Sequence, residues 1–154
     1  MATKRTLRAT MALAAGATIW LAGAGAAQAT EWRVADAAAA GFTFMDMHAV
    51  KRTGNKVQFA TWTIKINKAD NGIDNWKVVS VADCDRFSYR DVRVEYFAGA
   101  GFVERSESEP ELSAAPDTMA YSKVAVACGR KTASADIVAD PYALVQEHVR
   151  RSLL

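Results

Sequence analysis

The chain has 154 residues, of which 51% are hydrophobic and 23% are charged, and its formal net charge is +2. Three of its 19 basic residues and none of its 17 acidic residues precede residue 30, so residues 30–154 carry a net charge of −1. A near-neutral chain of this size has no general electrostatic attraction for nucleic acid or acidic lipid, and its length predicts one domain.

The first 29 residues predict a cleaved signal peptide. Three basic residues lie within the first eight positions, an apolar stretch covers 11–24, and residues 27–29 read Ala-Gln-Ala, which is typical of a cleavage site. The apolar stretch is too short for a permanent anchor, and no later stretch approaches the roughly 18 apolar residues of a membrane-spanning helix. We therefore expect a mature chain that begins at Thr30 and is exported to the periplasm or the medium. Because Thr30 is not a cysteine, no lipid anchor is expected.

The segments that follow have the composition of β-strands. Short strands are predicted at 32–34 and 42–46, with an Ala-rich loop at 36–41 between them. Residues 53–56, with the sequence Thr-Gly-Asn-Lys, predict a turn.

The next predicted strand, 57–67, is rich in β-branched and aromatic residues. Phe59 and Trp62 are three positions apart, so a strict alternation of period two would place these two apolar side chains on opposite faces of the strand. Either a bulge resets the phase or both faces of the strand are covered. We favour the second interpretation, with a helix on one face.

Two longer segments then predict an antiparallel meander. Residues 76–84 alternate, and 87–97 is expected to be the longest strand. A Gly-rich turn at 98–101 leads to a return strand that begins at 102–105. Short turns without intervening helices favour an antiparallel sheet. Within 87–97 the alternation places Val92, Val94 and Tyr96 on one face and Asp91, Arg93 and Glu95 on the other.

Helices are predicted after the strands. One runs to Cys128 from a cap at Asp117 or Thr118 and ends at Gly129. Residues 130–139 predict a linker. Asp140-Pro141 then starts a last helix. We thus expect an α+β fold, with a domain at 30–129 and a linker and helical tail at 130–154. One face of the last helix is expected to carry Tyr142, Val145, His148 and Val149.

Cys84 and Cys128 are the two cysteines of the chain. An even number in an exported protein predicts a disulfide, which would close a loop of about 45 residues and contribute about 4 kcal/mol. The alternative is a pair of buried free thiols. No C-x-x-C motif is present, and no metal site is expected.

Three groups of residues are candidates for function. Aromatic and basic residues alternate around Phe87, Tyr89 and Arg90, which could form a protein- or glycan-binding surface, although core packing is the commoner cause of such a pattern. Asp46 and His48 could point to one side as an acid–base pair, or lie in a solvated turn, and no nucleophile motif accompanies them. Asp83-Cys84-Asp85 could suggest a metal, but we favour a strand end with solvated acids and an inward cysteine. No catalytic residue and no cofactor is therefore expected.

The arrangement resembles the surface-adhesin protein E family of Gram-negative bacteria. The match covers roughly residues 32–129. It rests on the strand entry at 47–57, the strand at 57–66 with its central Trp62, residues 79–84, Tyr89-Arg90, the strand around Tyr96, Pro116 and the short helix that ends at Cys128.

The resemblance implies an antiparallel sheet with a helix packed on it, tied by a disulfide between a strand and that helix. Cys84 and Cys128 occupy those two places. The family's namesake is a lipid-anchored adhesin that binds host matrix and serum proteins. This chain differs in lacking the anchor cysteine and in having the extension at 130–154.

We therefore expect an exported, non-enzymatic binding module whose partner is a protein of the matrix or the cell envelope, and not nucleic acid. The alternative is a periplasmic structural or assembly protein whose partner docks on the final helix. A small hydrolase that uses Asp46 and His48 is a third hypothesis.

Overall fold

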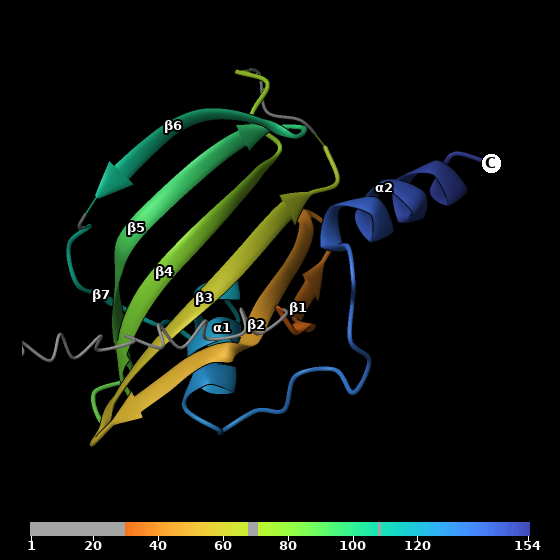
Figure 1. Ribbon diagram of the computed structural model, residues 1–154. Helices are drawn as coiled ribbons and strands as arrows, with labels where there is room; N and C mark the ends of the chain where they lie inside the picture. Colours follow the sequence, from red (N-terminus) through yellow and green to blue (C-terminus); the bar gives the residue numbers. More distant parts are fainter. Residues whose placement is uncertain (1–29, 68–70, 108) are drawn as a thin grey trace, which may run out of the picture.

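The computed structural model describes residues 30–67, 71–107 and 109–154, so the predicted signal peptide lies outside the described residues. Six strands form an antiparallel sheet in the order of the chain, which confirms the predicted meander (Figure 1). A two-residue strand, β7, pairs with the start of β5. The strands are β1 (Trp32–Ala38), β2 (Gly41–Thr53), β3 (Lys56–Lys65), β4 (Asn75–Asp83), β5 (Ser88–Ala98), β6 (Gly101–Glu107) and β7 (Leu112–Ser113).

Two of the hairpin turns lie where they were predicted. Thr53 pairs with Lys56 across the β2–β3 turn, and Ala98 pairs with Gly101 across the β5–β6 turn. Gly54 and Gly99 each have a φ of 60°, in the left-handed region that side chains disfavour. These glycines allow the chain to reverse within two residues.

The helix α1 (Met119–Ala127) is joined covalently to the sheet. Thr118 caps it, because its Oγ1 accepts a hydrogen bond from the backbone N–H of Tyr121 at 3.1 Å. The Cys84–Cys128 disulfide joins the residue after β4 to the residue after α1. The predicted helix and disulfide are confirmed, and the alternative of two free thiols does not hold.

The two faces of the sheet carry separate cores. Met45 and Phe59 cluster with Val124 of α1, on the side that we call the α1 face. Phe44, the neighbour of Met45 along β2, clusters with Val145 of the second helix on the opposite side, the α2 face. The β3–β4 register is unbroken, so no bulge in that pairing resets the phase. The interpretation that both faces of this strand are covered is therefore confirmed, with a helix on each face and not on one alone.

The first two strands are longer than predicted. The expected loop at 36–41 was wrong, because β1 continues to Ala38 and β2 starts at Gly41. A register shift between Val34 and Asp36 breaks the alternation of β1, which explains why the sequence pattern concealed the strand. With 13 residues, β2 is also longer than β5, which had been expected to be the longest strand.

A bulge in β5 corrects the predicted facing of Asp91. Val79 pairs with Arg93, but Ser80 pairs with Asp91, so Val92 is an extra residue in the ladder. The bulge places Asp91 on the same face as Val94 instead of on the opposite face. The sequence alternation cannot reveal this shift, because Val92 fits the apolar phase of a regular strand.

The segment after α1 packs along the sheet instead of hanging free as a linker. The N–H of Ser134 donates to the Val34 carbonyl at 2.9 Å, and the N–H of Val138 donates to the Trp32 carbonyl at 2.8 Å. These bonds occupy the outer edge of β1. Among the described residues, β6 at the other edge has β5 as its one neighbouring strand.

The helix α2 (Pro141–Ser152) docks on the α2 face through Tyr142, Val145 and Val149. Asp140 caps it, and Val145 is fully buried in the cluster on the α2 face. Tyr142 donates to a carboxylate oxygen of the buried Asp74 at 2.9 Å, and burial together with that carboxylate raises the pKa of Tyr142. Of the predicted face, His148 is exposed, with its ring edge-on to Phe42. Within the described ranges, no helix is long and apolar enough to cross a membrane.

Candidate functional site

The three residues that are candidates for a binding surface differ in their exposure. The ring of Tyr89 is 9% exposed and belongs to the core on the α1 face, where the Lys123 ammonium lies 4.3 Å from its centroid. Phe87 is partly buried against the same core. Arg90, the next residue after Tyr89 in the strand, is exposed. Most of the aromatic surface is thus used for packing, and a binding role for the three residues remains a prediction.

Phe87 has an unusual backbone conformation, with a φ of 52° that bulky side chains rarely adopt. Its carbonyl accepts a hydrogen bond from the N–H of Ala114 at 3.0 Å. Its ring lies 4.9 Å from the ring of Tyr121 and 4.7 Å from the guanidinium of Arg130. These contacts fix the turn after the disulfide against α1, so they explain the aromatic residue by packing.

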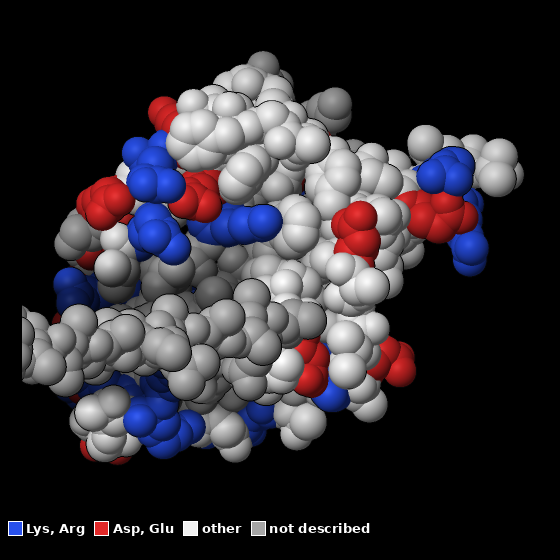
Figure 2. Space-filling view, in the orientation of Figure 1, with Lys and Arg blue, Asp and Glu red and all other residues white. Residues whose placement is uncertain are grey.

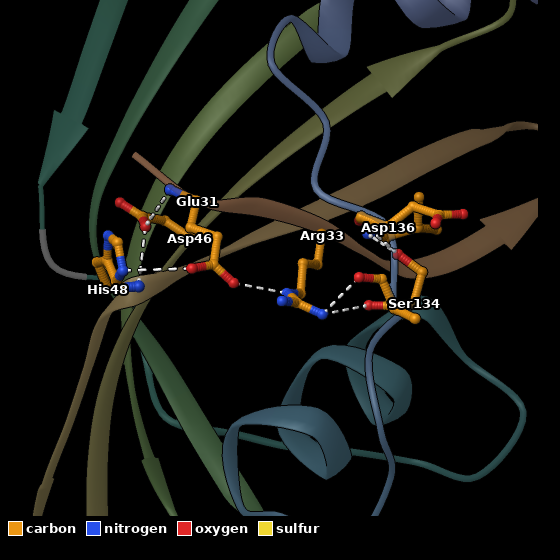
Figure 3. A network of polar contacts seen from close by, with 8 residues as sticks. Glu31, Arg33, Asp46, His48, Ser134 and Asp136 are labelled. Carbon is orange, nitrogen blue, oxygen red and sulfur yellow. Dashed lines mark hydrogen bonds and ion pairs between the residues drawn. The ribbon is translucent and has the colours of Figure 1, made fainter. Parts of the chain in front are cut away.

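Asp46 and His48 belong to a polar network at the start of the described chain (Figure 3). Asp46 accepts hydrogen bonds from the backbone N–H groups of His48, at 3.0 Å, and of Glu31, at 3.3 Å. The His48 ring lies with its Nε2 3.3 Å from the Glu31 carboxylate, which is also bound by Arg33 at 2.7 Å. Arg33 continues to the carbonyl of Ser134. The network thus ties the first described residues to the segment that follows α1.

Asp83 is buried, contrary to the predicted solvated strand end, and only 7% of it is exposed. One of its oxygens accepts from the N–H groups of Asp85 and Arg86, both at 3.1 Å, and the other binds the Lys56 ammonium at 3.2 Å. The carboxylate of Asp83 is thus held by backbone N–H groups of the turn between β4 and β5. Cys84 faces inward as predicted, and in the part of the chain that the structure describes no group of acids, histidines or cysteines could hold a metal ion.

Replacing Asp83 is expected to change the pH dependence of stability. The pKa of Asp83 is held below its ordinary value of 3.8, chiefly by the hydrogen bond from the Arg86 backbone N–H. The Lys56 ammonium and the Asp85 backbone N–H lower this pKa further, while burial opposes them. The carboxylate therefore stabilises the fold at pH values above 3.8 and loses this effect as the pH falls through its folded pKa. Melting curves of Asp83→Asn should lie below the parent at pH 7 and converge with it below pH 3.8. Asp85→Asn, at an exposed neighbour, is the matched control, and a constant gap for Asp83→Asn at all pH values would contradict the assignment.

An open pocket of about 360 Å³ lies on the α1 face of the sheet. Trp76 pairs with Tyr96 and Val78 pairs with Val94 across β4 and β5. The two valines are buried and form the floor, while the aromatic rings are half-buried beside it. Such a concave apolar surface with a few polar groups is typical of ligand sites. The lining residues are Lys65, Asn71, Ile73, Trp76, Val78, Asp91, Val94, Tyr96 and Glu109.

Asp91 lines the end of the pocket that is next to α1, and Lys123 of that helix binds it. Asp91 accepts a hydrogen bond from the hydroxyl of Ser80 at 2.6 Å and forms an ion pair with Lys123 at 3.3 Å. Burial lowers the pKa of Lys123 below its ordinary value, and the Asp91 carboxylate opposes this effect. The bulge at Val92 is what brings Asp91 to this face, so the pocket wall depends on an irregularity of the strand.

The sequence pattern predicts the apolar face on which the pocket lies, but not that this face stays uncovered. The alternation in β4 and β5 places Trp76, Val78, Val94 and Tyr96 on their apolar faces, as predicted. The pattern does not predict how much of this face α1 covers. The nine residues of α1 pack mainly on β1, β2 and β3 and reach β5 through Lys123, so the apolar surface around Trp76 and Tyr96 extends beyond the helix.

The α2 face carries acidic and basic side chains close to one another. Figure 2 shows acidic and basic side chains side by side over the outer strands and again along α2. Arg105 binds Glu95 at 2.7 Å, and Glu147 binds Arg150 and Arg151 at 2.6 and 2.8 Å. These pairs compensate one another at the surface and indicate no extended region of one sign at either place.

No protein-family model and no curated protein matches the sequence. The chain is similar in fold to solved structures of protein E from Haemophilus influenzae. Crystal form II has a TM-score of 0.42 at 14% identity, covering 62% of this chain and 92% of that chain. The selenomethionine form has a TM-score of 0.41 at 14% identity, covering 65% and 94%. The protein from a non-typeable strain has a TM-score of 0.39 at 13% identity, covering 76% and 92%. The resemblance expected from the sequence is therefore found as a similarity of fold.

Proposed function

We propose that the chain is an exported, non-enzymatic binding module that holds its ligand in the pocket between β4 and β5 on the α1 face. The observation that carries this proposal is the pocket itself. Its apolar floor of Val78 and Val94 and its half-buried Trp76 and Tyr96 are left uncovered by the helix that packs on the same face. Aromatic rings at the rim of a rigid sheet supply contact area at little cost in conformational entropy.

Export is supported by the disulfide. Disulfides such as Cys84–Cys128 form and persist in oxidising compartments such as the periplasm or the medium, and the leader-like first 29 residues agree with export. A binding role instead of catalysis is supported by the placement of reactive groups. The two cysteines are joined to each other, and the rings of His48 and His148 lie against Glu31 and Phe42 at separate places.

The proposal is tested by binding measurements on the exported protein with immobilised extracellular-matrix proteins and with envelope extracts. We expect at least one of these to bind, and the Trp76→Ala, Tyr96→Ala double variant to weaken that binding by about tenfold, on the scale of hot-spot aromatic residues. Phe102→Ala is the matched control, because Phe102 is an exposed aromatic residue that does not line the pocket. Absence of binding in every class, or an equal loss for Phe102→Ala, would reject the pocket as the site.

A second candidate is an envelope assembly protein whose partner docks on α2. It is favoured by the exposed Leu144 and by a shallow hollow beside it, lined by Glu147, His148 and Arg151. Leu144→Asp should remove partner binding while leaving the fold intact if this candidate is correct. Retention of binding by Leu144→Asp, together with its loss in the Trp76 and Tyr96 variant, would select the pocket.

A further inference from the structure

The pocket on the α1 face has opposite charges at its two ends. Lys65 lies at the end near Trp76, where its ammonium is 5.5 Å from the centroid of the indole ring. Glu109 lies at the other end, since its backbone N–H donates to the Asp91 carbonyl at 2.8 Å. The pairing of Ser80 with Asp91 locates that end four residues further along β4 than Trp76. The apolar floor separates the two charges.

The charges of Lys65 and Glu109 are available to a ligand, whereas that of Asp91 is already compensated. Asp91 forms its ion pair with Lys123 inside the pocket wall. Among the described residues, no ion pair involves Lys65 or Glu109, and the one hydrogen bond recorded for the Glu109 carboxylate comes from the hydroxyl of Ser106 at 3.2 Å. The site therefore offers one cation, an apolar floor and one anion in a row.

We propose that the pocket binds an extended segment of a partner protein that carries an acidic and a basic residue four positions apart, with an apolar residue midway. This inference rests on the proposed function of the pocket. Four residues of a strand span about 13 Å, and residues i, i+2 and i+4 of an extended segment point to one side. The acidic residue meets Lys65, the apolar residue contacts Val78 and Val94, and the basic residue meets Glu109.

Charge complementarity favours a protein segment over a glycan. A neutral glycan could stack on Trp76 and Tyr96, but it would use neither charge, and an acidic glycan would use Lys65 and be repelled by Glu109. Only a ligand with both signs at a fixed spacing uses every group that the pocket presents. The glycan is therefore an outcome of the test and not part of the proposal.

The test uses three labelled heptapeptides that share a central leucine and have serine elsewhere. Each peptide has one charged residue two positions before the leucine and another two positions after it. These are Glu and Lys in the mixed peptide, Lys and Lys in the double-Lys peptide, and Glu and Glu in the double-Glu peptide. Binding is measured by fluorescence anisotropy with the parent, Lys65→Glu and Glu109→Lys. The parent is expected to prefer the mixed peptide, Lys65→Glu the double-Lys peptide and Glu109→Lys the double-Glu peptide, each by about fivefold, on the scale of exposed ion pairs. Because each variant has a single sign at both ends, the result does not depend on the chain direction of the bound peptide.

Two controls sharpen the comparison. A mixed peptide with its charges two positions apart should bind as weakly as the mismatched peptides, and the preferences should disappear in 0.5 M salt. No binding of any peptide to the parent, preferences that do not follow the substitutions, or binding of neutral glycan alone would overturn the inference. If the Trp76 and Tyr96 variant still loses its ligand while the charge variants show no preference, the proposed function stands and the peptide inference fails.

Discussion

Cys128→Ser is expected to lower the free energy of unfolding by about 4 kcal/mol and the melting temperature by about 15 °C. The disulfide joins residues 44 positions apart, and in the chain-entropy model a loop of that length lowers the entropy of the unfolded state and so raises its free energy by about this much. The nine-residue helix α1 is also too short to be stable on its own and depends on its attachment to the sheet.

Thermal unfolding followed by circular dichroism, with and without reductant, measures this effect. Reductant should lower the melting temperature of the parent to that of the variant. The Cys84→Ser, Cys128→Ser double variant is the control, because it should match Cys128→Ser and be insensitive to reductant. A parent protein whose melting temperature is unchanged by reductant would show that the bridge is absent or without effect.

Val145→Asp is expected to destabilise the fold by about 3 kcal/mol or more, while Leu144→Asp should change it by less than about 0.5 kcal/mol. Val145 is fully buried on the α2 face against Phe44 and Ile64, whereas Leu144, one position earlier in the same helix, is 42% exposed. Burying an unpaired carboxylate is costly, but placing one at an exposed position is not.

Denaturant titrations of the two variants provide the measurement. Both introduce Asp at adjacent positions of α2, and the helix propensities of Leu, Val and Asp differ by less than about 0.7 kcal/mol, so propensity cannot explain a large gap between the variants. Equal midpoints would mean that α2 does not contribute to the core on the α2 face.

The strand order and the disulfide could be predicted because they depend on local signals. Gly54 and Gly99 mark tight turns, and a chain with two cysteines allows a single intramolecular pairing. The change of phase between Phe59 and Trp62 correctly indicated cover on both faces. Which segment supplies that cover depends on tertiary packing, so the role of α2 could not be predicted.

The candidate site was less predictable than the fold. Asp91 reaches the pocket because of a bulge at Val92. This bulge cannot be seen in the sequence, because an apolar residue at position 92 also fits the alternation of a regular strand. Asp83 is buried because N–H groups of the following turn fold onto it, a contact that composition does not contain. Tyr89, a candidate for a binding surface, packs in the core with Lys123 of α1 over its ring, in agreement with the commoner cause of such an aromatic pattern.

The two edges of the sheet differ in a way that limits how this protein can assemble. At β1 the backbone groups of Trp32 and Val34 are already occupied by Val138 and Ser134, so no further strand can be added there. At β6 no other described strand occupies the outer edge. If a second copy pairs edge to edge through β6, the joined sheet ends at a covered β1 edge on each side, so repeated edge-to-edge growth into fibres is blocked by the protein's own chain.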